Sequence, residues 1–176
     1  MPEVRRQSGR TTEVSSLDAI NLRLLAELQA DARLSLAELG RRVGLSSPAV
    51  AERLQRLEQE GVILGYHARL DPRKVGMTLT AVIRVRPAPR QVREVGDLAQ
   101  RTPEVVDCRR ITGEDCYIMT AHVRDVGHLE EVIDQFTAYG QTTTSIVQSA
   151  PVSDRGVMLE PDEEPARRSL RLAPSR

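Results

Sequence analysis

Residues 35–57 read SLAELGRRVGLSSPAVAERLQRL, a stretch that fixes the organisation of the N-terminal third of the chain. Gly44 predicts the end of one short amphipathic helix in a left-handed conformation. Ser46 or Ser47 then predicts the cap of the next helix, with Pro48 in its first turn. Two short helices joined in this way are typical of a helix-turn-helix, whose second helix lies in the DNA major groove.

A further helix is predicted before this motif. Asp18 is a suitable N-cap, and Leu17 and Leu22 stand at the positions of a hydrophobic staple. Ser35 and Glu38 predict a capping box at the start of the following helix. Apolar side chains recur at helical spacing through all three predicted helices: Ile20, Leu24, Leu25, Leu28, Leu36, Leu39, Val43, Val50, Leu54 and Leu57.

From Thr78 onward the apolar pattern changes from the helical period to a period of two. We expect a strand–helix–strand–strand–helix–strand order, with a hairpin turn near Gly113. The predicted strands cover 78–85, 105–111, 116–123 and 143–148, and the predicted helices cover 91–100 and 129–136. This order predicts a ferredoxin-like module. Its two helices can cover one face of the sheet, so the other face, if apolar, is expected to pack on another subunit.

The predicted fold class is α+β, with an N-terminal winged helix-turn-helix domain followed by a ferredoxin-like βαββαβ ligand-binding and oligomerisation domain. The alternation of apolar and polar residues from Val62 to Leu70 predicts a strand that serves as a wing or hinge. The two ends of the chain are polar and are predicted to be disordered. The predicted boundaries are 1–15 for the first tail, 16–61 for the helix-turn-helix domain, 62–77 for the hinge strand and linker, 78–152 for the ferredoxin-like domain, and 153–176 for the second tail.

The formal net charge of zero is distributed unevenly along the chain. Residues 17–60 carry six arginines against seven acidic residues, a net charge of −1. Residues 61–86 carry five basic residues against one acidic residue (+4), and residues 87–152 carry six against ten (−4). A small basic footprint attracts phosphates with modest affinity, so we expect several subunits to be needed for binding to DNA.

Other classes of protein find little support in the sequence. No apolar run approaches the roughly 18 residues of a membrane span, and the N-terminus has no apolar signal region, so we expect a cytoplasmic protein without membrane association. Cys108 and Cys116 are expected to be free thiols in a reducing compartment. The histidines at positions 67, 122 and 128 lack the spacing of metal ligands, and the chain has no glycine-rich phosphate loop. We therefore predict no metal, no cofactor and no enzymatic activity.

The second helix of the motif supplies candidate contacts to double-stranded DNA. Arginine can bond guanine with two hydrogen bonds, glutamate can accept one from cytosine, and serines at a helix N-terminus can bond phosphate. A solvated amphipathic helix in a small bundle is the alternative. Arg41 and Arg42 at the end of the preceding helix could contact phosphate or stabilise the helix dipole. The candidate DNA-binding residues are Arg41, Arg42, Ser46, Ser47, Glu52, Arg53 and Arg56.

Two polar segments of the second module could hold a small amino acid. A free amino acid needs a carboxylate to accept from its ammonium group, and hydroxyl or amide donors for its own carboxylate. The predicted hairpin turn and the start of the last strand supply both kinds of group. Ordinary turn chemistry and a β-prone threonine run are the alternative. The candidate effector-binding residues are Thr112, Gly113, Glu114, Asp115, Thr142, Thr143 and Thr144.

The whole arrangement resembles the Lrp/AsnC family of bacterial transcriptional regulators, also called feast/famine regulatory proteins. The resemblance covers about residues 17–152 and is carried by LDAINLRLLAELQADARLSLAELGRRVGLSSPAVAERLQRLEQEGVILGYHARLD followed by ITGEDCYIM. It implies sequence-specific binding to DNA, dimers joined through the C-terminal sheets and often assembled into octamers, and a small amino acid bound between dimers.

The chain departs from the family pattern at two positions. The family usually has an acidic residue where this chain has Asn21, a change expected to be tolerated if the position faces solvent. The family's aspartate in the hairpin turn falls on Cys116, after Gly113, Glu114 and Asp115. This second change bears on which amino acid binds, and on whether one binds.

Two other functions would fit the same architecture. Some proteins of similar architecture are haem-pathway decarboxylases, and such an activity would require histidine and arginine to line a porphyrin-sized cleft. His122 is the only histidine on a predicted strand of the second module. An effector-sensing module that has lost DNA binding is the other alternative, and it would bind an effector without retarding DNA in a gel.

Overall fold

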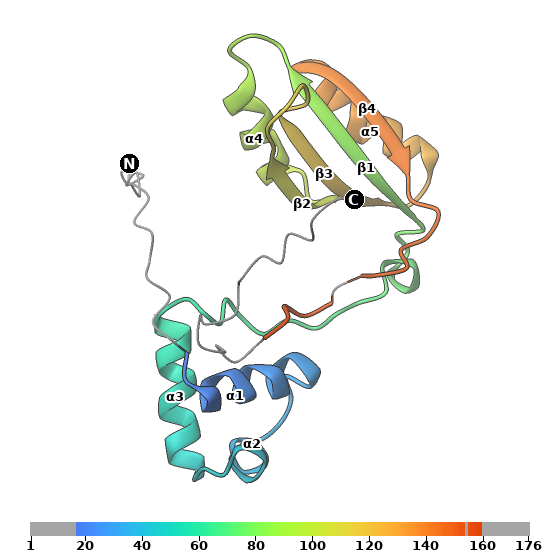
Figure 1. Ribbon diagram of the computed structural model, residues 1–176. Helices are drawn as coiled ribbons and strands as arrows, with labels where there is room; N and C mark the ends of the chain where they lie inside the picture. The colour runs from blue at the N-terminus through green and yellow to red at the C-terminus, as the bar shows by residue number, and fades with distance from the viewer. Residues whose placement is uncertain (1–16, 154, 160–176) are drawn as a thin grey trace, which may run out of the picture. The chain divides into compact units, whose positions relative to one another are not determined.

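The computed structural model describes residues 17–153 and 155–159. The tail predicted over 1–15 and most of the tail predicted over 153–176 lie outside these residues. The described residues form two compact units, one of residues 17–67 with 155–159 and one of residues 68–153. The element order, shown in Figure 1, is α1 (Ala19–Ala30), α2 (Leu36–Val43), α3 (Ser47–Gln59), a 3-10 helix η1 (Pro72–Val75), β1 (Leu79–Pro87), α4 (Val92–Arg101), β2 (Val105–Arg110), β3 (Tyr117–Val123), α5 (Val126–Thr137) and β4 (Gly140–Ile146).

The helix-turn-helix forms where the capping residues predict it. The Asp18 side chain accepts a hydrogen bond from the Asn21 backbone N–H at 2.7 Å and caps α1. Gly44 ends α2 with φ 77°, a left-handed conformation that glycine adopts without steric cost. Ser46, rather than Ser47, is the N-cap of α3, and its Oγ accepts from the Ala49 N–H. These caps fix the lengths of the helices and the turn between α2 and α3.

The capping box predicted at the start of α2 forms only in part. The Ser35 Oγ accepts from the Glu38 N–H at 3.2 Å, as expected. The Glu38 carboxylate does not complete the box, because it accepts hydrogen bonds from Arg41 and Arg42 instead. Guanidinium groups compete successfully with a backbone N–H for a carboxylate, since charge-assisted hydrogen bonds are the stronger ones.

The three helices enclose one apolar core. Gly40 allows the close approach of α2 to the following turn, because a Cβ atom at this position would collide with the Leu45 carbonyl oxygen. The buried side chains are Leu24, Leu25, Leu39, Val43, Val50, Leu54 and Leu57, all of which were predicted from helical spacing. The opposite faces of the helices are thereby left for solvent or a ligand.

The strand predicted over Val62–Leu70 is wrong. The Val62 and Ile63 N–H groups bond the Leu57 carbonyl at 2.9 and 3.1 Å, and the chain then runs on to η1 without entering a ladder. A strand needs a neighbouring strand to satisfy its backbone groups, and no described segment pairs with this one. The alternating pattern reflects exposed apolar side chains on a connecting segment, so the described chain has no wing strand.

The second tail also begins later than predicted. Gln29 Nε2 donates a hydrogen bond to the Val157 carbonyl at 3.1 Å, and Leu159 packs against the apolar core of the helix-turn-helix unit. The prediction of disorder from residue 153 is therefore wrong for residues 155–159. Three consecutive apolar side chains, ending at Leu159, give this otherwise polar segment an anchor.

The second unit has the predicted βαββαβ order. Its four strands form an antiparallel sheet in the order β2-β3-β1-β4. In the centre of the sheet Ile83 pairs with Met119 on one side and with Thr144 on the other. The elements lie close to the predicted ranges, although β4 begins at Gly140 rather than at residue 143.

Helices α4 and α5 both cover the same face of the sheet (Figure 1). The core between these layers contains Ala81, Ile83, Val85, Val95, Ala99, Tyr117, Met119, Ala121, Val123, Leu129, Val132 and Phe136. The alternation of side chains places Val82 and Ile118 on the opposite, open face, and the exposed Val106 lies at the register irregularity of β2. The other residues on this face are polar or charged: Thr80, Arg84, Arg86, Asp107, Arg109, Thr120, His122, Gln141, Thr143 and Ser145. The sequence left open an apolar second face of the sheet. In the structure this face is largely polar.

Candidate functional site

Helix α3 presents a row of polar side chains on the face opposite its buried stripe. Glu52 and Arg56 have side-chain exposures of 74% and 61% and form an ion pair of 3.2 Å one helical turn apart. Gln55 is also exposed and lies between them on this outward face. The sequence prediction included Glu52 and Arg56 but missed Gln55. The helical period, counted from the buried stripe, would have placed Gln55 between these two residues on the outward face.

The N-terminus of α3 carries the two predicted serines. Ser46 is exposed and uses its Oγ as acceptor for the helix cap, so its hydroxyl hydrogen is free to donate to a ligand. Ser47 is half-buried in the first turn. The positive end of the helix dipole lies here, which favours an anion such as a DNA phosphate.

Arg53 does not join the outward row, and the prediction that it does is wrong. Its side chain is 29% exposed, and its Nη1 donates to Asp18 Oδ2 at 2.6 Å and to Asn21 Oδ1 at 2.9 Å. The hydrogen bond from the Asn21 N–H and the contact with Arg53 lower the pKa of Asp18. Position 53 borders the buried stripe of α3, because it comes three residues after Val50 and one before Leu54.

Asn21 consequently does not face open solvent. It is half-buried in α1, and its side-chain oxygen accepts from Arg53 on α3. The change from an acidic residue to asparagine therefore alters a contact between α1 and α3 of the helix-turn-helix unit.

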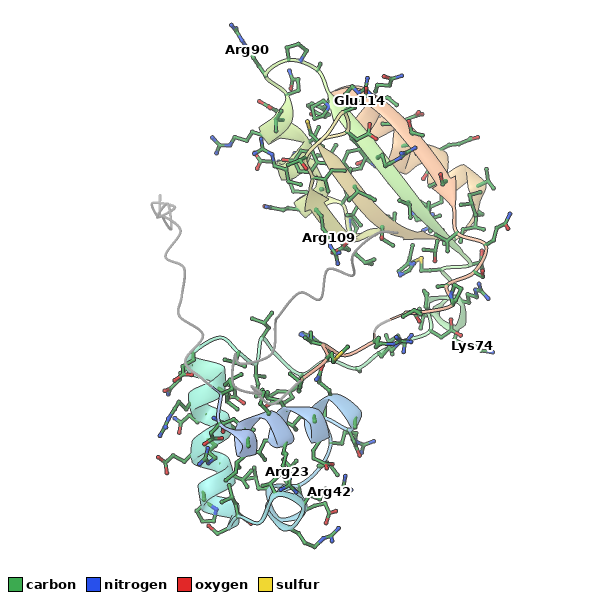
Figure 2. All side chains as sticks on the ribbon, in the orientation of Figure 1. Arg23, Arg42, Lys74, Arg90, Arg109 and Glu114 are labelled. Carbon is green, nitrogen blue, oxygen red and sulfur yellow. The ribbon has the colours of Figure 1, made fainter. Side chains whose placement is uncertain are left out.

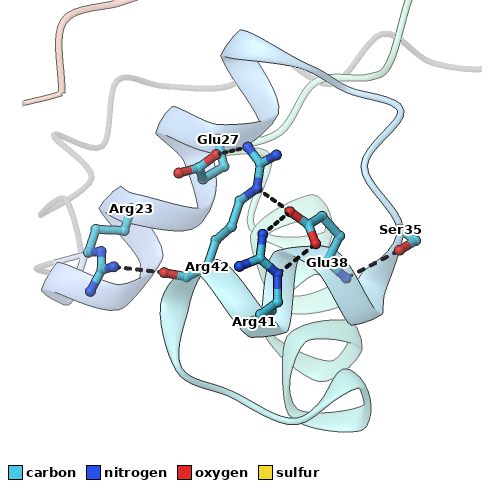
Figure 3. A network of polar contacts seen from close by, with 6 residues as sticks. All are labelled: Arg23, Glu27, Ser35, Glu38, Arg41 and Arg42. Carbon is cyan, nitrogen blue, oxygen red and sulfur yellow. Dashed lines mark hydrogen bonds and ion pairs between the residues drawn. The ribbon is translucent and has the colours of Figure 1, made fainter.

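A second polar network joins α1 to α2 (Figure 3). Arg42 Nη1 donates to Glu27 Oε2 at 2.6 Å, and its Nε donates to Glu38 Oε1 at 2.7 Å. Arg23 donates to the Arg42 carbonyl at 2.8 Å. Arg41 holds Glu38 with two hydrogen bonds and is 73% exposed. The hydrogen bonds from Arg41 and Arg42 lower the pKa of Glu38 to about 2.

The two arginines of this network differ in what they can still reach. Arg42 links two helices and is 37% exposed, whereas Arg41 contacts a residue of its own helix and extends further into solvent. Arg41 is therefore the better placed of the two for a phosphate contact, and Arg42 is the one that supports the fold.

The predicted hairpin residues gather beside two arginines of β1 at one end of the sheet. Figure 2 shows Glu114 at this end, where the turn between β2 and β3 contains Gly113 with φ 117°. Glu114 Oε2 accepts from Arg86 Nη2 at 2.5 Å, and Asp115 lies 3.7 Å from Arg84 and 4.0 Å from Arg86. The sequence prediction missed both arginines, although they belong to the basic segment 61–86.

The threonine run divides between the two faces of the sheet. Thr142 and Thr144 pair with Val85 and Ile83, so their side chains are on the helix-covered face, where both are half-buried. Thr143 pairs with Arg84 on the open face and is exposed. Of the three threonines, Thr143 alone shares a face with the arginines. Thr112 is exposed in the hairpin turn.

The histidines and cysteines form local contacts. Nε2 of the buried His128 lies 2.9 Å from Oε1 of Glu104, and its Nδ1 accepts from the Arg124 N–H at 3.3 Å. His122 Nδ1 lies 3.0 Å from Thr80 Oγ1 on the open face. Cys108 and Cys116 are free thiols, and burial raises the pKa of Cys108. Within residues 17–153 and 155–159 no cluster of three or more potential metal ligands occurs. No helix in this described part is long and apolar enough to cross a membrane.

Comparison with known proteins gives both units a family match. Residues 17–58 match the AsnC-type helix-turn-helix domain, and residues 80–157 match the Lrp/AsnC ligand binding domain. The chain is 38% identical over 134 residues to the uncharacterized HTH-type transcriptional regulator YezC of Bacillus subtilis, covering 76% of this chain and 95% of the relative. It is 36% identical over 143 residues to the regulator LrpA of Mycobacterium tuberculosis, covering 80% and 95%.

A solved structure of high similarity is the feast or famine regulatory protein of M. tuberculosis in complex with L-methionine. It is 35% identical, has a TM-score of 0.76, and covers 80% of this chain and 98% of its own. A capped helix-turn-helix in one unit and a match to a ligand binding domain in the other define a DNA-binding transcriptional regulator of the helix-turn-helix type. The chain belongs to the Lrp/AsnC family.

Proposed function

We propose that this regulator reads DNA with the outward face of α3. The proposal rests on the exposed pair of Glu52 and Arg56 on a helix that is capped at Ser46. Arginine and glutamate discriminate base pairs in the major groove, and the serines and helix N-terminus offer donors to a phosphate on the flanking strand. Arg41 adds a second phosphate contact from α2.

Each helix-turn-helix unit carries little positive charge, so strong binding to DNA requires more than one subunit. The six arginines of residues 17–60 are matched by seven acidic residues, and several of them are engaged in ion pairs. We propose dimers that associate through the open sheet face, with further assembly to octamers. The open face supports this arrangement because Val82 and Ile118 lie at its centre, among side chains that can pair across a two-fold axis.

The charged end of the sheet is the proposed site for a small amino acid. Arg84 and Arg86 can bind its carboxylate, and Glu114 or Asp115 can accept from its ammonium group. A zwitterion brings one positive and one negative group to a site of two arginines and two carboxylates, so the charges of the site stay balanced when it binds. Thr143 offers a hydroxyl group on the same face. The relative bound to L-methionine supports an amino acid as the class of ligand.

An amino acid held between subunits changes function by differential affinity. If the ligand binds one assembly more tightly than another, it shifts the equilibrium toward that assembly. A change of assembly then changes how many helix-turn-helix units can bind DNA half-sites at the same time, and at what spacing. The regulators named among the relatives support this reading over a decarboxylase of the same architecture.

Gel retardation of DNA fragments by the full chain tests the proposal. We expect retardation of a fragment from the region upstream of its own coding sequence at low salt, and weaker binding as salt rises. A fragment of equal length and scrambled sequence is the control. Failure to retard any fragment at low salt would overturn the DNA-binding function.

A thermal-shift screen with the common amino acids tests the effector site separately. A ligand that binds only the folded protein raises the melting temperature in proportion to the logarithm of its concentration above Kd. We include L-methionine in this screen, and the absence of any shift at millimolar concentrations would overturn the effector proposal.

A further inference from the structure

The environment of Arg53 differs from that of Arg56, the other arginine of α3. Its Nη1 donates to Asp18 and to Asn21, at 2.6 and 2.9 Å, so both hydrogens of this nitrogen are used within the protein. Its side-chain exposure of 29% is less than half the 61% of Arg56. A residue held in this way has little freedom to enter a groove.

Helix geometry agrees with the contacts. At about 100° per residue, Arg53 lies about 60° from the buried Val50, whereas Glu52, Gln55 and Arg56 lie about 160°, 140° and 120° from it. The side chain of Arg53 therefore leaves α3 along its edge, toward α1. The contact joins the middle of α3 to the first turn of α1, across 35 residues of sequence.

The anchor on α1 is itself fixed. Asp18 uses one carboxylate oxygen to cap α1 through the Asn21 N–H and the other to hold Arg53. One residue thus sets the start of α1 and the position of α3 at the same time. Asn21 adds a neutral acceptor one turn further along α1.

We propose that Arg53 is a positioning residue, which sets the angle of α3 against α1 through Asp18 and Asn21, and that Glu52, Gln55 and Arg56 read the bases. The inference rests on the proposed DNA-binding function. It assigns Gln55 to the reading face, where its amide can form two hydrogen bonds to adenine. A loss of Arg53 then tilts the whole reading face and weakens every DNA contact together.

The test compares two variants that break the same contact from opposite sides. Arg53→Met keeps the apolar stem and removes the hydrogen bonds. Asp18→Asn keeps an oxygen that caps α1 but turns an amide toward the guanidinium group of Arg53. The probes are a duplex selected by the wild-type chain from a random-sequence pool and a scrambled duplex of the same composition.

We expect each variant to bind both probes about fivefold more weakly and to select the same base preferences as the wild-type chain. The double variant should be no weaker than Arg53→Met, because the contact that Asp18→Asn breaks is already lost in Arg53→Met. Gln55→Ala is the matched comparison on the outward face. It should retain its melting temperature and change the selected preference at one base pair.

Two results would overturn the inference. One is a change of base preference at a single position in Arg53→Met while Asp18→Asn selects and binds like the wild-type chain. The other is losses that add in the double variant. If Arg53→Met does not fold, Asp18→Asn alone tests the inference. In that case the inference requires Asp18→Asn to weaken binding to DNA without changing the selected base sequence. Failure of the wild-type chain to select any sequence would instead count against the proposed function.

Discussion

Arg42 on α2 donates a hydrogen bond of 2.6 Å to Glu27 on α1, while its Nε holds Glu38 on its own helix at 2.7 Å. The Arg42 side chain therefore links α1 to α2. Arg41, the next residue, contacts Glu38 alone and is far more exposed. The two neighbours are therefore matched probes that separate support of the fold from contact with DNA.

We predict that Arg42→Met lowers the melting temperature of the chain by a few degrees and that Arg41→Met leaves it nearly unchanged. Arg41→Met should instead reduce the slope of log affinity against log salt by about 1, as expected for one lost phosphate contact. Thermal unfolding followed by circular dichroism and a salt titration on one duplex measure the two effects. Equal melting temperatures for the two variants would contradict the structural role of Arg42.

The second prediction concerns pH. The pKa of Glu38 in the folded chain is about 2, lowered from an ordinary 4.5 by the hydrogen bonds from Arg41 and Arg42. Because the folded-state pKa is the lower one, this group stabilises the fold above about pH 4.5, and its contribution is lost as pH falls toward 2. Glu38→Gln should therefore flatten the fall of the melting temperature across this window. Glu60→Gln, at an exposed position, is the control, and a profile of Glu38→Gln that matches the wild type would reject the assignment.

A third prediction contrasts two glycines near the turn of the helix-turn-helix. A Cβ on Gly40 would collide with the Leu45 carbonyl oxygen, whereas a Cβ on Gly44 would meet open space but a left-handed backbone. We expect Gly44→Ala to cost about 1 kcal/mol and Gly40→Ala about 3 kcal/mol of unfolding free energy. Urea denaturation measures both values. The reverse order would show that backbone conformation, and not close packing, limits this turn.

A fourth prediction addresses the C-terminal segment 155–159. Leu159 packs on the core of the helix-turn-helix unit, whereas its neighbour Met158 is 78% exposed. Leu159→Ala should lower the unfolding free energy of that unit by about 1 to 2 kcal/mol, and Met158→Ala by less than about 0.5 kcal/mol. Urea unfolding followed by the helical circular dichroism signal measures the two variants, which should be indistinguishable if the segment is not anchored.

The fifth prediction uses the division of the threonine run. Thr143 lies opposite Arg84 on the open face, whereas Thr142 lies on the helix-covered face. Thr143→Val should reduce the thermal shift produced by an amino acid effector, and Thr142→Val should retain it. Arg86→Gln should strongly reduce the shift, because it removes one of the two arginines proposed to bind the effector carboxylate. A full shift in Arg86→Gln would place the effector elsewhere.

Much of the fold follows from local patterns in the sequence. Caps such as Asp18, Ser35 and Ser46 act within three residues of themselves, and the buried stripe of α3 follows from a fixed helical period. The βαββαβ order follows likewise from the change of period at Thr78. These features depend on short-range geometry that a single chain displays directly.

The candidate sites depend on partners that lie far apart in the chain, and here prediction from sequence was incomplete. Arg53 lies at the edge of the buried stripe of α3, where helical spacing alone does not say which way the side chain turns, so its contact with Asp18 was decided by tertiary packing across 35 positions. Arg84 and Arg86 meet the hairpin acids because β1 pairs with β3. The strand expected over Val62–Leu70 is absent because a strand also depends on a distant partner. The alternation of apolar and polar residues predicts an extended backbone, but it does not provide a second strand to pair with.

A binding titration of wild type and Arg56→Ala, on a duplex selected by the wild-type chain and on its scrambled counterpart, tests the role of α3 in DNA recognition. The wild type should prefer the selected duplex at least about a hundredfold, and Arg56→Ala should lose about tenfold of this preference while keeping its melting temperature. Equal binding of the two duplexes by the wild type, or an unchanged preference in Arg56→Ala, would contradict the claim that the outward face of α3 reads DNA.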